Sequence, residues 1–187
     1  MNKKITAYDD AMAIFKKSSV LLSEQQVDAS ITKLAARLND DYSEKTPLVL
    51  CVMNGGLIAT AKLVSKLTMP LQMDYIHATR YGDEVVGRKL NWIAEPKSSL
   101  KGRDVILVDD ILDEGITLQS LVEFCRAEGA ASVKAALLVK KNHDRCVAPE
   151  FGDYVGLEVP DKFIFGCGMD YKGFFRNLPA IYAVEDS

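Results

Sequence analysis

The chain has 187 residues, 48% of them hydrophobic, so it is long enough for one domain with a buried core. Its formal net charge of -3 and its pI near 5.5 disfavour bulk attraction to nucleic acid or to an anionic membrane, although a local basic pocket could still hold a phosphate. The four cysteines form no C-x-x-C pair, which disfavours a zinc site or a disulfide framework and favours reduced thiols in a cytoplasm.

A long helix and a strand-turn-helix unit are the first predicted elements. Ser23 and Gln26 have capping-box spacing, and apolar residues then recur at helical intervals, which predicts a helix over residues 23–41. A short apolar run over residues 48–53 ends at the turn 54–56, which contains two glycines, and a second helical pattern follows. We therefore expect an amphipathic helix that covers a sheet, followed by a strand, a tight turn and a helix.

Strands and helices continue to alternate along the rest of the chain. Residues 71–79 are predicted to form a strand, whereas residues 81–88 are polar and contain two glycines, which indicates a mobile loop. The run 105–108 is apolar on both faces, as is typical of a central parallel strand. A helix over residues 118–125 and a buried strand over residues 133–139 follow. This order predicts an α/β fold with a central, mostly parallel twisted sheet flanked by helices.

The domain organisation is expected to be simple. We find no internal repeat, low-complexity segment or linker, so residues 1–187 are predicted to form a single domain. Short strand-like pieces occur at residues 155–157 and 163–165. We expect the N-terminal residues and about residues 153–187 to build a small hood over the edge of the sheet.

The most informative segment joins the strand at residues 105–108 to the next helix. Ligands of open α/β sheets bind beyond the carboxyl ends of the strands, where Asp109 and Asp110 are expected. These adjacent carboxylates repel each other, and ribose hydroxyls or a hard cation would explain them. The turn 113–117 then enters a helix whose positive end suits a phosphate. Asp113 or Thr117 alone is more simply explained as a helix cap, but the combination favours a ribose-phosphate site.

The sequence of residues 108–117, Val-Asp-Asp-Ile-Leu-Asp-Glu-Gly-Ile-Thr, resembles the phosphoribosyl pyrophosphate (PRPP) binding motif of type I phosphoribosyltransferases. Residues 53–56 resemble the pyrophosphate loop of that family, whose first peptide is often cis. Lys140 and the segment 160–176 resemble the hypoxanthine-guanine branch in particular. The order and spacing agree from about residue 48 to 178, so the resemblance implies the type I phosphoribosyltransferase fold.

The resemblance also implies a role for individual residues. Asp113, facing N7 of the purine, and Tyr81, in a loop that closes over the site, are the expected catalytic residues. The expected PRPP-binding residues are Asn54, Gly55, Asp109, Asp110, Asp113, Glu114, Gly115, Ile116, Thr117 and Arg176. The expected base-binding residues are Lys140, Lys162, Phe163, Ile164 and Asp170. The expected magnesium ligands are Asp109, Asp110 and Asp170.

Three positions depart from the family pattern. Glu114 stands where the family more often has a small polar residue, and a carboxylate beside a phosphate is repulsive unless it points outward. Arg80 replaces one residue of the Ser-Tyr pair often found at the start of the flexible loop. Asn54 replaces the lysine of some relatives, which removes one positive charge from the pyrophosphate subsite.

The function implied by the resemblance is purine salvage. Such a glycosyltransferase makes IMP and GMP from hypoxanthine or guanine plus PRPP and releases pyrophosphate, with Mg²⁺ as its cofactor. The alternatives are a phosphoribosyltransferase-like regulator that binds PRPP or a nucleotide, and a xanthine-preferring homologue. A phospho-acceptor signalling domain also has a strand ending in Asp-Asp, but that pair should lie near the start of the domain.

The expected partners are PRPP and a 6-oxopurine base, with neither nucleic acid nor membrane. The resemblance implies a homodimer or a homotetramer. Asp9 and Asp10 interrupt the apolar stretch that a secretory signal needs, and no apolar run reaches membrane-spanning length, so a cytoplasmic location is expected. Because His77 and His143 are the two histidines, a metal is expected to be a hard ion held by oxygen.

Overall fold

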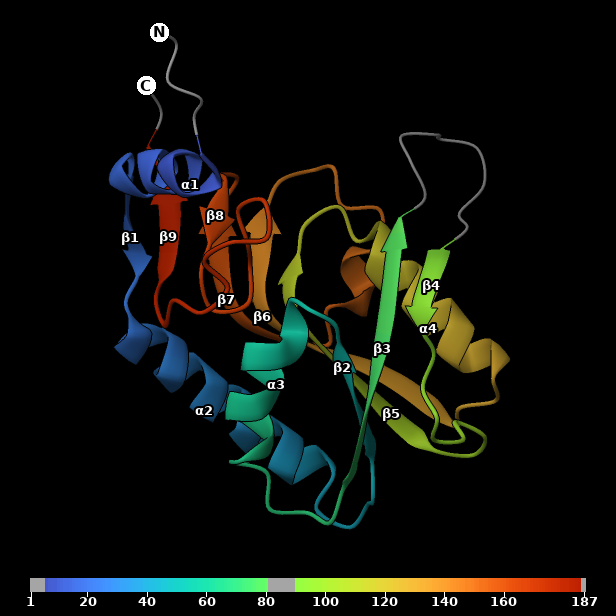
Figure 1. Cartoon of the computed structure of the whole chain (residues 1–187). Helices are drawn as coiled ribbons and strands as arrows, with labels where there is room; N and C mark the ends of the chain where they lie inside the picture. The colour runs from blue at the N-terminus through green and yellow to red at the C-terminus, as the bar shows by residue number, and fades with distance from the viewer. Residues whose placement is uncertain (1–5, 81–89, 186–187) are drawn as a thin grey trace, which may run out of the picture.

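The computed structural model of the chain describes residues 6–80 and 90–185. A six-stranded sheet has the order β4-β3-β2-β5-β6-β7, and a second, three-stranded sheet has the order β1-β9-β8 (Figure 1). In the larger sheet β4 is antiparallel to β3 and the other strands are parallel. Its strands are β2 (Leu48–Val52), β3 (Gln72–Arg80), β4 (Leu90–Ala94), β5 (Asp104–Leu112), β6 (Ser132–Asn142) and β7 (Tyr154–Pro160).

Helices cover both faces of this sheet (Figure 1). The helices are α1 (Ala7–Lys16), α2 (Glu24–Asp41), α3 (Gly56–Val64) and α4 (Ile116–Ala127), with a short 3-10 helix η1 (Pro149–Phe151). Residues of α2 and α3 form one hydrophobic cluster with the sheet, and residues of α4 form another with its opposite face. Every residue of β2 is buried, because a strand covered on both faces has no solvent side.

The sequence signals for α2 are borne out by its geometry. Ser23 caps the helix, since its hydroxyl accepts from the Gln26 backbone and the Gln26 side chain accepts from the Ser23 backbone. Val27, Ile31 and Leu38 are buried at helical spacing. Each fully buried side chain of this size contributes about 1.5–3 kcal/mol relative to exposure, so this face fixes α2 to the sheet.

Strand β5 is longer than the apolar run at residues 105–108 predicts. It continues to Leu112 because β6 pairs with it as far as Lys140. Asp109 and Asp110 therefore lie inside the end of the strand, where the pairing with β6 continues past them. This places the two carboxylates on the rigid sheet and leaves the turn before α4 to residues 113–115.

The smaller sheet joins segments from the two ends of the chain. Strands β1 (Ser18–Leu22), β8 (Ile164–Phe165) and β9 (Ile181–Val184) pair in antiparallel fashion, and α1 lies at one end of them (Figure 1). Phe15 of α1 packs against Phe165 and Tyr182. Because β7 extends the parallel sheet, the C-terminal part of the smaller sheet begins at β8, later than residue 153.

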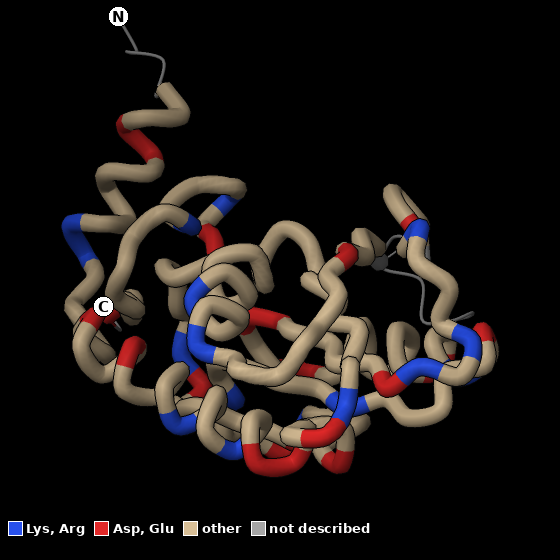
Figure 2. The backbone as a smooth tube through the Cα atoms, turned by 90° about the horizontal axis from the view of Figure 1, so that it is seen from below, with Lys and Arg blue, Asp and Glu red and all other residues tan. Residues whose placement is uncertain are grey.

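Two further expectations concern the surface. The loop predicted at residues 81–88 lies outside the described residues. Within the described ranges, no helix is both long and apolar enough to cross a membrane. Lys and Arg are interspersed with Asp and Glu along the described chain (Figure 2).

Candidate functional site

A cavity of about 550 Å³ lies beyond the carboxyl ends of β2 and β5. Every residue predicted to bind PRPP lines this cavity, together with Asp170. His77 and Thr79 of β3 also line it, and neither was predicted to be a site residue. Tyr81, which was predicted to be catalytic, lies outside the described residues, and so does the side chain of Arg80.

The turn after β2 forms one wall of the cavity through close backbone contacts. The peptide between Met53 and Asn54 is cis. A Cβ atom added to Gly55 would lie 2.1 Å from Oδ2 of Asp110, so a side chain at this position would collide with the acidic pair. The predicted glycine turn is therefore packed directly against the strand end that carries the carboxylates.

Asp109 and Asp110 form a partly desolvated acidic pair. Burial raises the pKa of Asp109 well above its ordinary value, and the adjacent charge of Asp110 adds to the rise. Burial also raises the pKa of Asp110, although its contact with Asp109 and the nearby Arg176 oppose the rise. Hydroxyl donors or a cation would stabilise the ionised pair.

Arg176 connects this pair to the segment between β8 and β9. Its guanidinium forms an ion pair with Asp170, donates to the carbonyl of Gly168 and lies 3.9 Å from Oδ2 of Asp110. The arginine is partly exposed, with 33% of its side chain accessible, so it presents charge to the cavity. A planar guanidinium suits recognition of phosphate oxygens.

The turn before α4 has the backbone of an anion site. Gly115 has φ of 79°, a left-handed conformation that glycine adopts without steric cost, and α4 begins at the next residue. In the described part of the chain no side chain caps α4, so neither Asp113 nor Thr117 is a helix cap. The first residues of α4 line the cavity, and the positive end of a helix with its free N–H groups would stabilise a phosphate there.

The residues predicted to bind the base have different surroundings. Phe163 is 50% exposed, and its ring lies edge-on to Tyr171 at 5.9 Å. Ile164 is buried in β8, and the Lys162 backbone donates to the carbonyl of Pro160. Among these predicted residues, within the described ranges, Asp170 lines the cavity and the others lie outside its lining.

Lys140 and Lys141 point to different faces of the sheet. Lys140 pairs in register with Leu112, which packs in the cluster on the α4 side. Residues paired across adjacent strands share a face, so Lys140 is directed toward the α4 side. Lys141 instead reaches Asp113, with its Nζ 2.7 Å from Oδ2. The base-binding role of Lys140 stays a prediction, and Lys141 is the lysine that the structure brings to Asp113.

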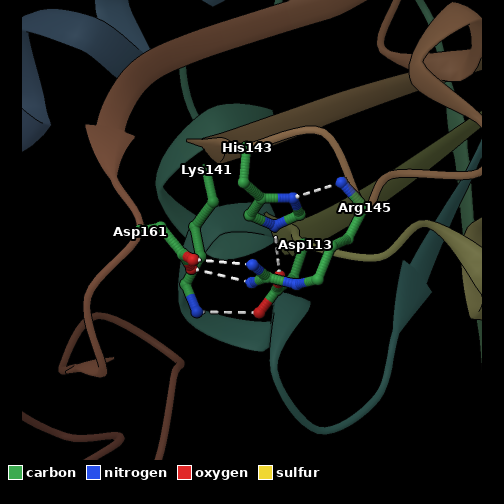
Figure 3. A network of polar contacts seen from close by, with 5 residues as sticks. All are labelled: Asp113, Lys141, His143, Arg145 and Asp161. Carbon is green, nitrogen blue, oxygen red and sulfur yellow. Dashed lines mark hydrogen bonds and ion pairs between the residues drawn. The ribbon is translucent and has the colours of Figure 1, made fainter.

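Asp113 is the centre of a polar network (Figure 3). Lys141 approaches one of its oxygens, and Nε2 of His143 lies 2.6 Å from the other. Beside them Arg145 and Asp161 form a two-pronged ion pair at 2.8 and 2.9 Å. Burial tends to raise the pKa of Asp113, but the hydrogen bonds from Lys141 and His143 outweigh it and leave the pKa below its ordinary value.

Comparison with known proteins identifies this arrangement. Residues 18–172 match the phosphoribosyl transferase domain. The chain belongs to the phosphoribosyltransferase family. It is 37% identical over 163 residues to a hypoxanthine-guanine phosphoribosyltransferase of Bacillus subtilis (strain 168), which covers 87% of this chain and 90% of that protein.

Solved structures agree with this membership. A hypoxanthine-guanine phosphoribosyltransferase from Bacillus anthracis superposes with a TM-score of 0.84 at 29% identity, covering 89% of this chain and 98% of that one. A hypoxanthine-guanine-xanthine phosphoribosyltransferase superposes with a TM-score of 0.81 at 29% identity, covering 90% and 97%. The predicted family resemblance and the predicted α/β fold with a small hood are confirmed.

Sequence reasoning missed two residues of this phosphoribosyltransferase, Lys141 and His143. The available signal was the adjacent pair of lysines at the end of the strand, because alternation places one on each face. Choosing between them needs the register of β6 against β5. His143 follows β6 in a loop whose path toward Asp113 has no sequence signal of its own.

Replacing Gly115 by alanine is expected to weaken PRPP binding about tenfold. A side chain in the left-handed region costs about 1–2 kcal/mol, and 1.4 kcal/mol corresponds to roughly a factor of ten. The added Cβ would also lie 3.1 Å from Sγ of Cys146, which is tighter than an ordinary van der Waals contact. Isothermal titration with PRPP measures the change.

Gly102 provides a matched control for this substitution. It has φ of 71°, does not line the cavity, and an added Cβ would meet no described atom within 4 Å. Gly102→Ala should therefore carry a similar backbone cost and bind PRPP as the unmodified chain does. Equal PRPP affinity in the two variants would contradict the assignment of the turn at Gly115 to a phosphate.

Proposed function

We propose that this phosphoribosyltransferase is a purine salvage enzyme that makes IMP or GMP from hypoxanthine or guanine plus PRPP and releases pyrophosphate. The observation that carries the proposal is the convergence of the acidic pair of β5, the turn before α4 and Arg176 on one cavity. A ribose that bears a 5′-phosphate and a diphosphate requires acceptors for hydroxyls, N–H donors for phosphate and a cation. These three features supply one of each.

The chain's contribution to the reaction is positioning and electrostatics. A ring nitrogen of the base forms a bond to C1 of the ribose while the bond from C1 to the pyrophosphate oxygen breaks. Asp109 and Asp110 hold the ribose hydroxyls, the turn at Gly115 holds the 5′-phosphate, and Arg176 approaches the diphosphate. The carboxylates of Asp109 and Asp110 also stabilise the positive charge that develops on the ribose, so the transition state is stabilised more than the substrate.

Asp113 acts on the base in this proposal. Its carboxylate is ionised under ordinary conditions, because its pKa lies below the usual range. A carboxylate beside N7 orients the purine by accepting a hydrogen bond and accepts the N7 proton as the bond at the other ring nitrogen forms. Lys141, which contacts Oδ2 of Asp113, is the lysine that we assign to purine position 6.

Magnesium fits the carboxylates of the cavity. Mg²⁺ is usually held by one or two carboxylates together with substrate phosphates and water, so an all-protein cage is not required. Asp109 and Asp110 offer such oxygens, and Asp170 does so while sharing its charge with Arg176. When bound, the ion supplies charge neutralisation for the diphosphate leaving group.

Removal of the metal is expected to abolish turnover. Arg176 is the one lysine or arginine among the described residues that line the cavity, and a single cation cannot neutralise PRPP. Nucleotide formation should therefore stop in excess EDTA and return when Mg²⁺ is restored. PRPP should also raise the melting temperature more with Mg²⁺ than with EDTA. Full turnover after rigorous metal removal would contradict the magnesium assignment.

A direct assay tests the proposed function. The chain is incubated with PRPP, hypoxanthine and Mg²⁺, and IMP and pyrophosphate are quantified. Equal amounts of the two products are expected from the unmodified chain, and much less from Asp110→Asn, which loses a charged acceptor for the ribose. The absence of IMP under these conditions would overturn the proposal.

The alternatives are separated by simple measurements. A PRPP-binding regulator of nucleic acid would show an electrophoretic shift with strong salt dependence. The interspersed charges in Figure 2 and the net charge of -3 disfavour it. Preference for xanthine is the closer alternative, since one superposed relative is a hypoxanthine-guanine-xanthine enzyme. Rates with the three 6-oxopurines distinguish these cases.

We further propose that residues 1–187 act as one domain and that the hood closes the base side of the cavity. The proposed assembly is a homodimer or a homotetramer, and the proposed location is the cytoplasm. The sedimentation of the purified chain tests the assembly.

A further inference from the structure

We infer that His143 is a positioning residue that fixes the carboxylate of Asp113 for contact with the purine. The inference rests on the proposed function, because it concerns the residue assigned to purine N7. The side chain of His143 is 5% exposed, and its Nε2 lies 2.6 Å from Oδ1 of Asp113. The contact joins the loop after β6 to the turn before α4, two segments that are distant in the sequence.

The direction of this hydrogen bond follows from the other ring nitrogen. Nδ1 of His143 lies 3.1 Å from the backbone nitrogen of Arg145, whose N–H can donate but cannot accept. Nδ1 must therefore be the acceptor, and the proton of a neutral imidazole is then on Nε2. Nε2–H donates to Asp113, so the backbone of Arg145 selects the tautomer that orients the carboxylate.

Arg145 is itself held in place by an ion pair. Its guanidinium contacts both oxygens of Asp161, which follows β7 and directly precedes Lys162. The contacts thus run from Asp161 through Arg145 and His143 to Asp113 (Figure 3). Because Arg145 is 56% exposed, we assign this ion pair a geometric role rather than a large stabilising one.

The charges around Asp113 explain why we assign its contact with His143 to orienting the carboxylate and not to a metal site. Asp113, His143 and Asp161 have ligand atoms within 4.8 Å of one another. Lys141 and Arg145 already contact the two carboxylates, however, and supply the positive charge that a metal ion would bring.

The two oxygens of Asp113 have different neighbours. Lys141 contacts Oδ2, and His143 donates to Oδ1. Each carboxylate oxygen has two lone pairs, so one lone pair of each remains for the purine. With both oxygens bound, the plane of the carboxylate is fixed before the base arrives. Asp113 is 37% exposed, and it lines the cavity where the proposed function puts the purine.

Removal of the His143 donor should change the pH dependence in a definite direction. The charged or titratable groups considered around Asp113 are Lys141, His143, Arg145, Asp161 and the adjacent Glu114. Hydrogen bonds to the ionised carboxylate lower its pKa, so loss of the Nε2 donor raises that pKa. Since the ionised form is the active one, the acid limb of kcat/KM should move to higher pH.

Two amide substitutions separate the functions of the two ring nitrogens. In His143→Gln the side-chain amide reaches the position of Nε2 and can donate to Asp113. In His143→Asn the amide lies at the position of Nδ1, where its oxygen can accept from Arg145 but no donor reaches Asp113. The pair therefore removes or retains the proposed contact while both residues remain small, neutral and polar.

We expect kcat with hypoxanthine to fall about 10- to 100-fold in His143→Asn, the scale of loss caused by misplacing a reacting group. The affinity for PRPP should be unchanged in both variants. The acid limb of kcat/KM should move to higher pH in His143→Asn and stay in place in His143→Gln, which should recover most of kcat. Equal kcat and equal pH profiles in the two variants would overturn the inference.

A second measurement decides the matter without turnover. The pKa of the Asp113 carboxyl is measured by carbon NMR in the unmodified chain and in both variants. We expect a higher pKa in His143→Asn than in the other two proteins, and the same value in all three would overturn the contact. If the unmodified chain forms no IMP while this pattern holds, the proposed function fails and the contact between His143 and Asp113 stands.

Discussion

Replacing Asp113 by asparagine is expected to lower kcat by about 100- to 10,000-fold, the usual contribution of a positioned acid-base group. The asparagine keeps the shape of the side chain and can still accept a hydrogen bond from His143. It has no negative charge, however, and it is far too weak a base to take the proton of purine N7. Because Asp113 is not a helix cap, the turn and α4 should remain folded and PRPP should still bind. Steady-state kinetics and PRPP titration test the two parts separately.

Asp153 supplies a matched control for this experiment. It forms an ion pair with Lys134 at 2.7 Å and does not line the cavity. Asp153→Asn makes the same chemical change and should leave kcat within about twofold, because its contacts with Lys134 and with the Ala135 N–H lie away from the cavity. If Asp113→Asn retained the kcat of Asp153→Asn, Asp113 would have no direct part in the reaction.

Discrimination against adenine is the second large effect. A lysine ammonium donates hydrogen bonds and cannot accept them, so at purine position 6 it pairs with an oxo group and rejects the amino group of adenine. A site built around a specific polar partner discriminates by roughly 10,000-fold or more, because the wrong ligand leaves a buried group unpaired. We therefore expect kcat/KM for adenine to be lower than that for hypoxanthine by about this factor.

The two adjacent lysines allow a direct comparison. Lys141 contacts Asp113 and its side chain is 12% exposed, whereas Lys140 points toward the α4 side of the sheet. Lys141→Ala should therefore reduce the ratio of hypoxanthine to adenine use at least tenfold, by the same donor argument. Lys140→Ala should leave the ratio unchanged. The opposite result would support the base-binding role predicted for Lys140, and unchanged selectivity in both variants would exclude these two lysines as the selecting group.

The parts of the fold with local signals could be predicted from the sequence. The capping box at Ser23 marks α2, and the apolar run at residues 105–108 followed by Gly115 marks the strand, turn and helix around the cavity. The glycine turn at residues 54–56 could be predicted for the same reason. These elements depend on residues that are neighbours in the sequence.

The elements that the sequence did not predict depend on distant partners. Strand β9 has four residues and is ordered by pairing with β1, from the opposite end of the chain. Strand β4 is an edge strand that pairs antiparallel with β3 alone. In the site, the contacts of Lys141 and His143 depend on the register of β6 and on the path of the following loop. No local pattern of residues encodes these relations.

Product analysis with a panel of bases directly tests whether the chain makes nucleotides from 6-oxopurines and PRPP. The chain is incubated with PRPP and Mg²⁺ and with adenine, guanine, hypoxanthine or xanthine, and the nucleotides and pyrophosphate are separated and quantified. We expect GMP from guanine and IMP from hypoxanthine, with one pyrophosphate for each nucleotide, much less product from xanthine, and least from adenine. No nucleotide from either guanine or hypoxanthine, or AMP as a main product, would contradict this expectation.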